Sequence, residues 1–362
     1  MKVGIIGAGQ LGRMLALAGY PLGLQFEMLD PNPEACGGQV APLTVADFDD
    51  RQALAALAGR VDVVTFEFEN VPVAALKFLA GHTEVLPRPE VLETAQDRLR
   101  EKECFQNLTI PTPAYREVGS LEQLRAAAEQ LGLPAVLKTR RLGYDGKGQA
   151  VLRRAADLEP AWASLGEMNG HGLILESFVG FEREVSLVAA RGRDGDMVFY
   201  PLAENTHRDG ILDLSVARAT DPMQAQAEDY TRRVLELYDY VGVLAFEFFH
   251  TEDGLVANEI APRVHNSGHW TIEGAETSQF ANHLRAILGW PLGAPDLVGQ
   301  AAMLNFIGSL PVAPDLLIHP GLHLHSYGKS AAPGRKVGHA TLRLPASADL
   351  AAALQKVRAG LE

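Results

Sequence analysis

Two glutamates, Glu247 and Glu259, are the side chains of this 362-residue chain best placed for chemistry. They lie in two strand-like runs separated by the polar segment 252–254. A hairpin with a three-residue loop over this segment places the two carboxylates directly opposite each other. Facing carboxylates repel, and a divalent cation that prefers oxygen ligands, such as Mg²⁺, removes that cost. The pair therefore predicts a metal site, with the alternative that one glutamate pairs with Arg263 or faces solvent.

A basic loop follows Lys138, which lies near the end of another predicted strand. It carries Arg140, Arg141 and Lys147 together with three glycines within 143–148. Glycines let such a loop move as a flap, and the cations around it could surround a polyphosphate during transfer. Phosphoryl transfer requires both cations and Mg²⁺, so the loop and the glutamate pair together predict that chemistry. The alternative for the loop alone is a solvated basic turn.

The segment 7–12 has the spacing Gly-x-Gly-x-x-Gly between a predicted strand and a predicted helix. Glycines in that context let backbone N–H groups approach a phosphate at the start of the helix. Asp30, at the end of the next predicted strand, lies near where a ligand of an NAD ribose would be. The motif fits a dinucleotide site, a mononucleotide phosphate site or a tight turn, and all three readings stay open.

Two more polar segments could hold anions. Arg263 and His265 come directly after the strand of Glu259, where they could hold a carboxylate or bicarbonate next to the metal. Lys329 and Arg335 lie in a loop of the last part of the chain that is rich in glycine and proline. The alternatives are a structural histidine and an exposed turn.

The elements that position these residues change in type along the chain. Strand-like and helical runs alternate over 1–95, which is typical of an open parallel sheet. Helices are expected after the caps Asp97 and Ser120, the second as part of a capping box. The strands expected in the first part are 2–6, 24–29 and 61–66, with helices at 11–18, 51–58 and 73–79.

Hairpins replace crossovers in the middle of the chain, which predicts an α+β region. A long helix is expected to begin at Pro222, because proline suits the first helical position. From 301 onward, short strands and a last helix capped by Ser347 predict a small third unit.

The composition of the chain indicates which binding partners and which cellular location to expect. The net charge of −13 and the pI near 5.3 argue against nucleic acid and favour small molecules. The two cysteines, Cys36 and Cys104, form neither a disulfide framework nor a zinc motif. The N-terminal apolar run is too short for a signal peptide and no stretch could span a membrane. We therefore expect a soluble, cytoplasmic protein.

Four segments together resemble a known family: GQLGRM at 9–14, GYDGKGQ at 143–149, NEIAPRVHNSGH at 258–269 and PGRKVGH at 333–339. In this order they resemble the N5-carboxyaminoimidazole ribonucleotide synthetases of purine biosynthesis, which are ATP-grasp enzymes, essentially from end to end. The resemblance implies an α/β and α+β fold in three parts. These are a Rossmann-like pre-ATP-grasp domain over 1–95, an ATP-grasp domain over 96–300 with a lid at about 113–180, and a C-terminal subdomain over 301–362.

The resemblance also implies an ATP-dependent carbon–nitrogen ligase. Its substrates would be ATP, 5-aminoimidazole ribonucleotide and bicarbonate, and its products N5-carboxyaminoimidazole ribonucleotide, ADP and phosphate, formed through carboxyphosphate. Mg²⁺, or Mn²⁺, would accompany ATP, and a homodimer is the expected assembly.

Site residues implied by the resemblance fall into four groups. The nucleotide would be bound by Arg98, Lys138, Gly143, Tyr144, Asp145, Gly146, Lys147, Gly148, Gln149, Glu176, Val179, Glu184, His207, Asn258 and Glu259, with Glu176 and Val179 at the adenine and Glu184 at the ribose. The ribonucleotide would be bound by Gly9, Gln10, Leu11, Glu67, Tyr144, Lys329 and Arg335. The catalytic group would be Asp145, Arg263, His265 and Lys329, of which Arg263 and His265 would orient bicarbonate. The metal would be held by Glu247 and Glu259.

One position departs from the wider superfamily. Many ATP-grasp enzymes carry asparagine two residues after the second metal carboxylate, and this chain has Ala261 there. A third protein ligand to the metal is therefore missing.

Three other functions compete with this interpretation. A formate-dependent glycinamide ribonucleotide transformylase also forms an acyl phosphate. It differs in the substrate acid that is activated and in the amine that accepts it. An NAD-dependent oxidoreductase would use Asp30 but would leave the glutamate pair unexplained. A non-catalytic nucleotide sensor need not keep its metal carboxylates.

Overall fold

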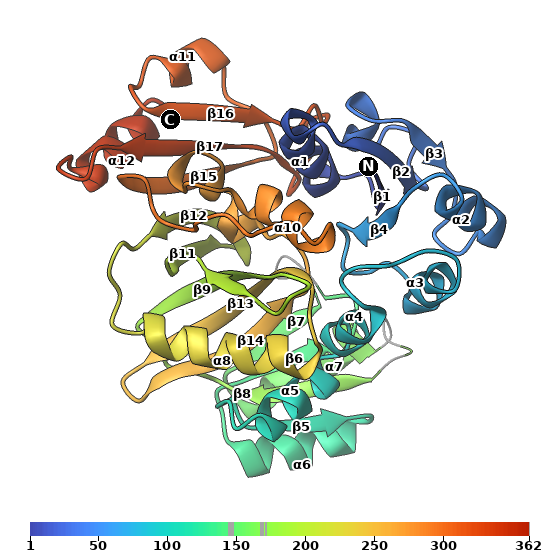
Figure 1. Ribbon diagram of the computed structural model, residues 1–362. Helices are drawn as coiled ribbons and strands as arrows, with labels where there is room; N and C mark the ends of the chain where they lie inside the picture. Colours follow the sequence, from blue (N-terminus) through green and yellow to red (C-terminus); the bar gives the residue numbers. More distant parts are fainter. Residues whose placement is uncertain (144–147, 167–169, 171, 362) are drawn as a thin grey trace.

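The computed structural model describes residues 1–143, 148–166, 170 and 172–361, and these residues form three sheets (Figure 1). The first sheet is parallel, in the order β3-β2-β1-β4. The neighbouring residues Ile5 and Ile6 are both fully buried, which shows that both faces of this sheet are covered. The elements are β1 (Lys2–Ile6), α1 (Gln10–Gly19), β2 (Gln25–Asp30), β3 (Leu43–Val45), α2 (Arg51–Ala58), β4 (Val63–Phe66), α3 (Val73–Ala80) and α4 (Pro89–Ala95).

The predicted alternation of strands and helices in this first part is confirmed. Strand 2–6 and helix 51–58 have the predicted bounds, and the other predicted elements differ by one or two residues at their ends. The edge strand β3 was not predicted, because three residues are too few to show a period.

A smaller antiparallel sheet, in the order β5-β8-β6-β7, carries two helices. The cap Ser120 is confirmed, since its side chain accepts a hydrogen bond from the Gln123 N–H. The capping box is not complete, because the Gln123 side chain accepts from Gly119 instead of Ser120. This part comprises α5 (Arg98–Asn107), β5 (Tyr115–Val118), α6 (Leu121–Leu131), β6 (Ala135–Thr139), β7 (Gln149–Leu152), α7 (Leu158–Gly166) and β8 (Leu173–Ser177).

The largest sheet of the described residues has nine antiparallel strands in the order β14-β13-β9-β11-β12-β15-β17-β16, with β10 paired to β9. Its helix α8 begins at Gln224, so Pro222 is not its first residue as predicted. The elements are β9 (Arg183–Arg191), β10 (Met197–Phe199), β11 (Ala203–Arg208), β12 (Ile211–Ala217), α8 (Gln224–Leu237), β13 (Gly242–Thr251), β14 (Gly254–Ala261), α9 (Thr271–Gly274), α10 (Gln279–Ile287) and β15 (Gln300–Ile307), followed by α11 (Ala313–Leu317), β16 (Leu322–Ser326), β17 (Lys336–Leu344) and α12 (Leu350–Ala359).

The C-terminal strands extend the central sheet. Strand β15 pairs with β12, and Leu304 lies opposite Leu214. The predicted third unit therefore has no sheet of its own, although its predicted strands are present. The cap of its last helix is Asp349, which accepts from the Ala352 N–H, and not Ser347 as predicted.

Helix α10 joins the first sheet to the central one. Leu15 of α1 and Leu284 of α10 belong to one buried apolar cluster that also contains Val243 of β13. The His283 ring contacts both sheets, with Nε2 2.8 Å from the Thr65 hydroxyl and Nδ1 accepting from the Val243 N–H at 3.1 Å.

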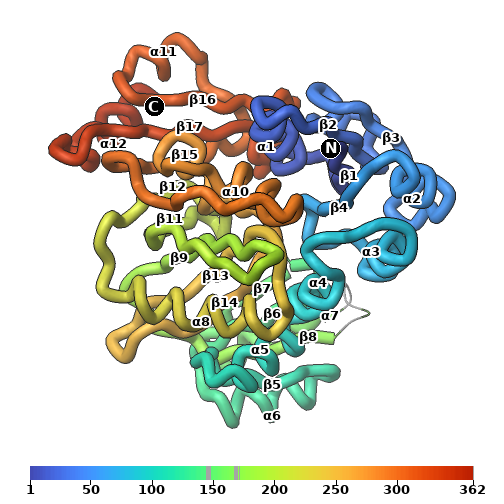
Figure 2. The backbone as a smooth tube through the Cα atoms, in the orientation of Figure 1, coloured from blue at the N-terminus to red at the C-terminus, as the bar shows by residue number. Residues whose placement is uncertain are grey.

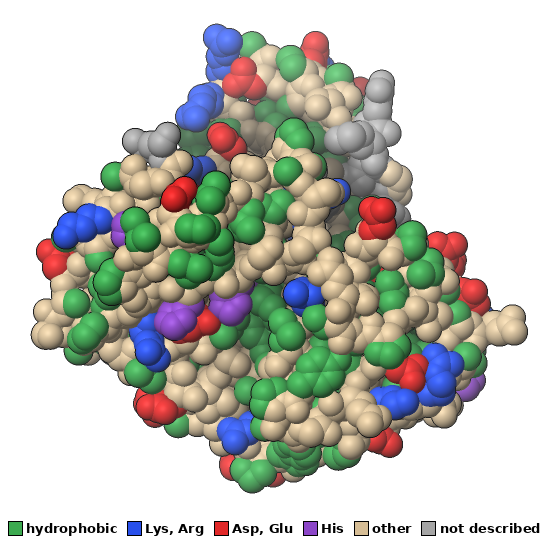
Figure 3. Space-filling view, turned by 90° about the horizontal axis from the view of Figure 1, so that it is seen from above, with side chains coloured by type: hydrophobic (Ala, Val, Ile, Leu, Met, Phe, Trp, Pro, Cys, Tyr) green, Lys and Arg blue, Asp and Glu red, His purple; other side chains and the backbone are tan. Residues whose placement is uncertain are grey.

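The surface carries both signs of charge. On the face seen from above in Figure 3, Lys and Arg side chains are interspersed with Asp and Glu. The described part of this face therefore lacks the continuous basic stripe that a nucleic acid backbone requires. In the described residues, each helix is too short or too polar to cross a bilayer.

Candidate active site

A cavity of about 1590 Å³ is lined by residues of all three sheets and of the loops that leave them. The structure brings nearly every predicted site residue to this cavity. Its lining includes Gly9, Gln10, Leu11, Glu67, Arg98, Lys138, Gly143, Gln149, Glu176, Val179, Glu184, His207, Glu247, Asn258, Glu259, Arg263, His265, Lys329 and Arg335.

The glycine-rich loop is described only at its two ends. Gly148 closes the loop against β6, because its carbonyl accepts from the Thr139 N–H at 2.8 Å. The predicted residues Tyr144, Asp145, Gly146 and Lys147 lie outside the described residues.

The carboxylate pair has the predicted arrangement, since Glu247 of β13 lies directly opposite Glu259 of β14. The predicted loop is wrong. Thr251 pairs with Gly254, which leaves a two-residue turn, and a β-bulge after Glu247 inserts Asn258 as an extra residue. The bulge restores the register that the shorter turn would shift, and it brings both Asn258 and Glu259 to the cavity wall.

The two carboxylates differ in charge state. Burial and the neighbouring Glu259 raise the pKa of Glu247 to about 7. Burial also acts to raise the pKa of Glu259, but the Arg98 guanidinium, which bonds to it at 2.8 Å, outweighs burial and lowers that pKa. Arg98 therefore compensates Glu259, whereas Glu247 is a buried carboxylate that a cation would stabilise. The alternative partner Arg263 is excluded, because it pairs with Glu69.

A second ion pair lies in the same part of the cavity. Lys138 of β6 bonds at 2.8 Å to Glu176 of β8, and Lys102 of α5 lies 3.9 Å from the other oxygen of Glu176. Burial acts to raise the pKa of Glu176, but the two ammonium groups lower it to about 2. Lys102 is fully buried and is a site neighbour that sequence reasoning missed, since a lysine in a charged helix normally faces solvent.

His207 of β11 lies next to this cluster. Its Nδ1 is 3.0 Å from Glu184 of β9. Burial lowers the pKa of His207, and the bond to Glu184 more than offsets it, so the pKa is raised overall.

The predicted bicarbonate pair lies beside the glutamates. The His265 Nδ1 accepts from the Ser267 N–H at 3.3 Å, which assigns the ring proton to Nε2, and Nε2 is 3.5 Å from Glu247. Burial and the charge of Arg263 hold the pKa of His265 well below its usual range, so the ring is neutral. Arg263 donates from Nη1 to the Val264 carbonyl at 3.0 Å.

The glycine turn between β1 and α1 is held by two carboxylates. Glu67 accepts from the Gly9 N–H at 2.9 Å and the Gly12 N–H at 3.3 Å, and Asp30 accepts from the Ala8 N–H at 2.8 Å. Gly7 has a φ of +93°, and a Cβ there would lie 2.7 Å from Glu67. Asp30 thus serves the turn itself, which argues against the NAD interpretation.

The last loop of the chain reaches this turn. Lys329 donates to the Gln10 side chain, and its ammonium lies 5.9 Å from the centre of the Tyr327 ring. Burial lowers the pKa of Lys329. Figure 2 shows the C-terminal segment, in orange and red, beside the blue helix α1. Residues more than three hundred positions apart therefore form one wall of the cavity.

Comparison with known proteins agrees with this geometry. The ribonucleotide synthetase preATP-grasp domain matches residues 1–96, the ATP-grasp domain matches 103–280, and the phosphoribosylaminoimidazole carboxylase C-terminal domain matches 301–353. The fold is that of an ATP-grasp ligase.

The relatives define the family more closely. The N5-carboxyaminoimidazole ribonucleotide synthase of Pseudomonas aeruginosa is 58% identical over 362 residues, covering 100% of both chains. That of Bacillus subtilis is 41% identical over 349 residues, covering 94% of this chain and 90% of the relative. The chain belongs to the N5-carboxyaminoimidazole ribonucleotide synthase family of purine biosynthesis, as its motifs suggested.

Solved structures give the same result. The Thermus thermophilus synthetase superposes with a TM-score of 0.92 at 55% identity, covering 99% of this chain and 97% of that one. The Aspergillus clavatus synthase, solved with ADP and 5-aminoimidazole ribonucleotide, has a TM-score of 0.91 at 31% identity and covers 99% and 98%.

Proposed function

We propose that the cavity joins bicarbonate to the amine of 5-aminoimidazole ribonucleotide at the expense of ATP. The observation that carries this proposal is the placing of Glu247, Glu259, Arg98 and Lys138 in the same cavity as Lys329 and the glycine turn. The two glutamates and the two cations supply the metal ligands and the positive charges that phosphoryl transfer needs. The last two are suited to the phosphate of a mononucleotide.

At the ATP end, Arg98 and Lys138 would bind the phosphates together with the loop 143–149. In the described structure both cations bond to carboxylates, Arg98 to Glu259 and Lys138 to Glu176. A polyphosphate replaces one charge-assisted bond by another, so little is lost when the cations change partners. Glu176 and Val179 would then bind adenine, with Glu184 at the ribose and His207 and Asn258 nearby.

Mg²⁺ fits the glutamate pair, with Mn²⁺ as the substitute. Glu247 and Glu259 would hold it, since Glu247 is a buried carboxylate that no nearby cation neutralises enough to keep its pKa low. Among the described residues no group of three acidic, histidine or cysteine side chains could hold a metal, so these two carboxylates would be the protein's share. Bound there, the ion would neutralise charge on the transferring phosphate oxygens.

Arg263 and His265 would orient bicarbonate toward the γ-phosphorus. A bicarbonate oxygen attacks that phosphorus, the bond to the bridging oxygen of ADP breaks, and carboxyphosphate forms. Arg263 is suited to bind the carboxylate oxygens, and the Nε2–H of His265 can donate to one of them. As a neutral donor, His265 stabilises this anion without taking a proton from it.

The ribonucleotide would occupy the other end of the cavity. Lys329, Arg335 and the segment Gln10–Leu11 would meet its phosphate, and Glu67 would face its base. Carboxyphosphate releases CO₂ and phosphate, the amine nitrogen attacks CO₂, and the amine proton goes to the phosphate. A site closed to water protects the intermediate.

Labelled oxygen tests this sequence. With bicarbonate carrying ¹⁸O and the ribonucleotide present, the phosphate released early in the reaction should contain one oxygen from bicarbonate. If water attacked the γ-phosphorus instead, label would enter phosphate from ¹⁸O-water and not from bicarbonate, and the proposed function would be wrong.

The domain bounds 1–95, 96–300 and 301–362, the lid at about 113–180, a homodimer and a cytoplasmic location are further proposals that rest on the family resemblance. Light scattering of the purified protein would test the dimer, because a mass close to 39.0 kDa would contradict it.

A further inference from the structure

Strand β14 carries the proposed metal ligand Glu259 at the edge of the central sheet, where β13 is its one paired strand among the described residues. Its outer edge is bonded by side chains of helix α5. The Lys102 ammonium donates to the carbonyl of Asn258 at 2.6 Å and to that of Ala257 at 3.4 Å. A carboxyl oxygen of Glu101 accepts from the Ile260 N–H at 2.8 Å. These two side chains, together with the Pro111 carbonyl that accepts from the Ala257 N–H at 2.7 Å, take the place of a missing strand beside the bulge.

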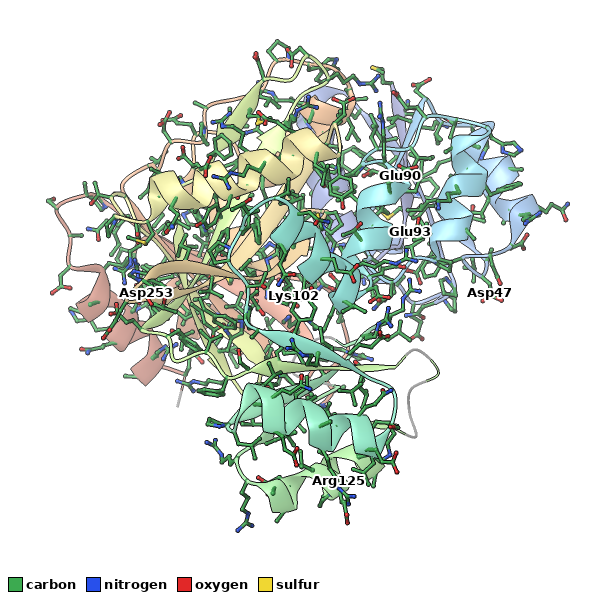
Figure 4. The ribbon with its side chains drawn as sticks, turned by 90° about the horizontal axis from the view of Figure 1, so that it is seen from below. Asp47, Glu90, Glu93, Lys102, Arg125 and Asp253 are labelled. Carbon is green, nitrogen blue, oxygen red and sulfur yellow. The ribbon has the colours of Figure 1, made fainter. Side chains whose placement is uncertain are left out.

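These two residues are unusual in their burial. Glu101 is 1% exposed and Lys102 is fully buried. In Figure 4 Lys102 lies in the interior, whereas the labelled charged residues Arg125 and Asp253 lie at the periphery. Buried charged groups lower stability unless they have hydrogen-bond or ionic partners. Apolar residues of the same size often stabilise a fold equally well. Their placement at the bulge therefore points to a role in the site.

Lys102 also contacts the second half of the ATP site. Its ammonium is 3.9 Å from one oxygen of Glu176, and Lys138 bonds to the other oxygen. When Lys138 turns toward a phosphate, Glu176 loses its closest cation. The Lys102 ammonium cannot turn toward the phosphate in the same way, because it is bonded to the carbonyls of β14. It therefore stays beside Glu176.

We propose that Lys102 and Glu101 are positioning residues that fix the bulge presenting Asn258 and Glu259, and that Lys102 is the standing counter-ion of Glu176 once Lys138 binds phosphate. This inference rests on the proposed function of the ATP site. Glu101 lines the cavity with its carboxyl bonded to the Ile260 N–H, and Lys102 lies behind the cavity wall, so we expect both to act through the groups that they hold.

Matched variants separate this role from ordinary folding. Glu101→Gln keeps an oxygen that accepts from Ile260, and Glu101→Leu removes it. Lys102→Met removes the ammonium and keeps an unbranched chain. For Glu101→Leu and Lys102→Met we expect the Kd of ADP, measured by calorimetry in EDTA, to rise about tenfold or more. The KM values of bicarbonate and the ribonucleotide should stay within about twofold, and Glu101→Gln should resemble the unchanged protein.

The core variant Val234→Ala, in the same apolar cluster as α5, is the control for lost stability. It should lower the melting temperature and leave the Kd of ADP unchanged. The proposal is overturned if Glu101→Leu and Glu101→Gln bind ADP alike, or if all KM values rise in parallel in the folded variants. If Lys102→Met does not fold, the two Glu101 variants decide.

Glu259→Gln distinguishes this inference from the proposed function. If Glu259→Gln keeps the normal Mg²⁺ dependence of turnover, the proposed metal site is wrong. If Glu259→Gln loses activity while Lys102→Met and Glu101→Leu bind ADP normally, only the positioning role is wrong.

Discussion

At the scale of residues, the ATP half of the cavity is paired within itself. Arg98 bonds to Glu259 and Lys138 bonds to Glu176; the second pair is buried, whereas the Glu259 side chain is 40% exposed to the cavity. Glu247 is the exception, since burial and its neighbour raise its pKa to about 7. Arg98 and Lys138 are therefore held in place by carboxylates, whereas the charge of Glu247 depends on whether a cation binds beside it.

Replacing Glu259 with glutamine removes the charge from one proposed metal ligand and the ionic partner of Arg98. We expect Glu259→Gln to lower the rate of ADP formation by roughly a hundredfold or more, because charge on the transferring phosphate is no longer neutralised. The circular dichroism spectrum should be unchanged, because glutamine has the same shape. A variant with near-normal turnover would refute the metal assignment.

The raised pKa of Glu247 predicts how metal binding varies with pH. Below pH about 7 the carboxyl is protonated, and the proton competes with the cation for its oxygens. The apparent Mg²⁺ affinity, measured by calorimetry with ADP present and without bicarbonate, should fall up to tenfold per pH unit below about 7 and level off above it. The groups facing Glu247 are Glu259, His207, Glu184, His265 and Lys336.

Glu247→Gln is the control for this dependence. Its Mg²⁺ affinity should be weak at every pH and should no longer show a step near 7. An unchanged step in this variant would assign the titration to another group.

At the scale of elements, the glutamate pair was predicted correctly through two errors that cancel. The turn is one residue shorter than predicted, and the bulge at Asn258 shifts the register back by one. Period-two alternation indicates which residues share a face, but it carries no signal for a bulge. The bonds of Lys102 and Glu101 to β14 could not be predicted either, because they depend on where α5 packs.

For the glycine turn, the motif was found from the sequence but its ligand was not. The motif and Asp30 were recognised, yet the sequence left its ligand open, since the same spacing serves several phosphates. The structure shows that Asp30 and Glu67 bond to the turn itself. The spacing alone could not show that these carboxylates face the backbone.

Removing the Asp30 side chain tests the turn. Asp30→Ala leaves the Ala8 N–H without its acceptor, so we expect a loss of about 1–2 kcal/mol in the free energy of unfolding. The KM of the ribonucleotide should rise roughly tenfold and that of ATP should not change. Asp50→Ala, which removes the cap of α2, is the matched control and should lose similar stability without a change in the ribonucleotide KM. Equal KM effects in the two variants would contradict a role of the turn in binding.

At the scale of the whole molecule, the parts are joined by contacts between distant segments. Strand β15 continues the sheet begun by β9 to β14, and α10 packs against α1 of the first sheet. The sequence predicted these strands but not their common sheet, because partners such as Leu214 and Leu304 are far apart in the chain. The cavity depends on this assembly, since its walls come from all three parts.

His283 is a fully buried polar link in this assembly, and burial lowers its pKa to about 3, so it stays neutral. His283→Ala leaves the Thr65 hydroxyl and the Val243 N–H without partners, and we expect a loss of about 2–4 kcal/mol in the free energy of unfolding by urea. The exposed His82→Ala should change it by less than about 0.5 kcal/mol. Unfolding of the first sheet in a separate transition would contradict a common core.

ADP release from MgATP, with bicarbonate and 5-aminoimidazole ribonucleotide added singly and together, tests the central claim most directly. We predict slow release with either alone and fast release with both, in a ratio of one ADP to one N5-carboxyaminoimidazole ribonucleotide. Release that is independent of the ribonucleotide, or that requires formate and glycinamide ribonucleotide instead, would contradict it.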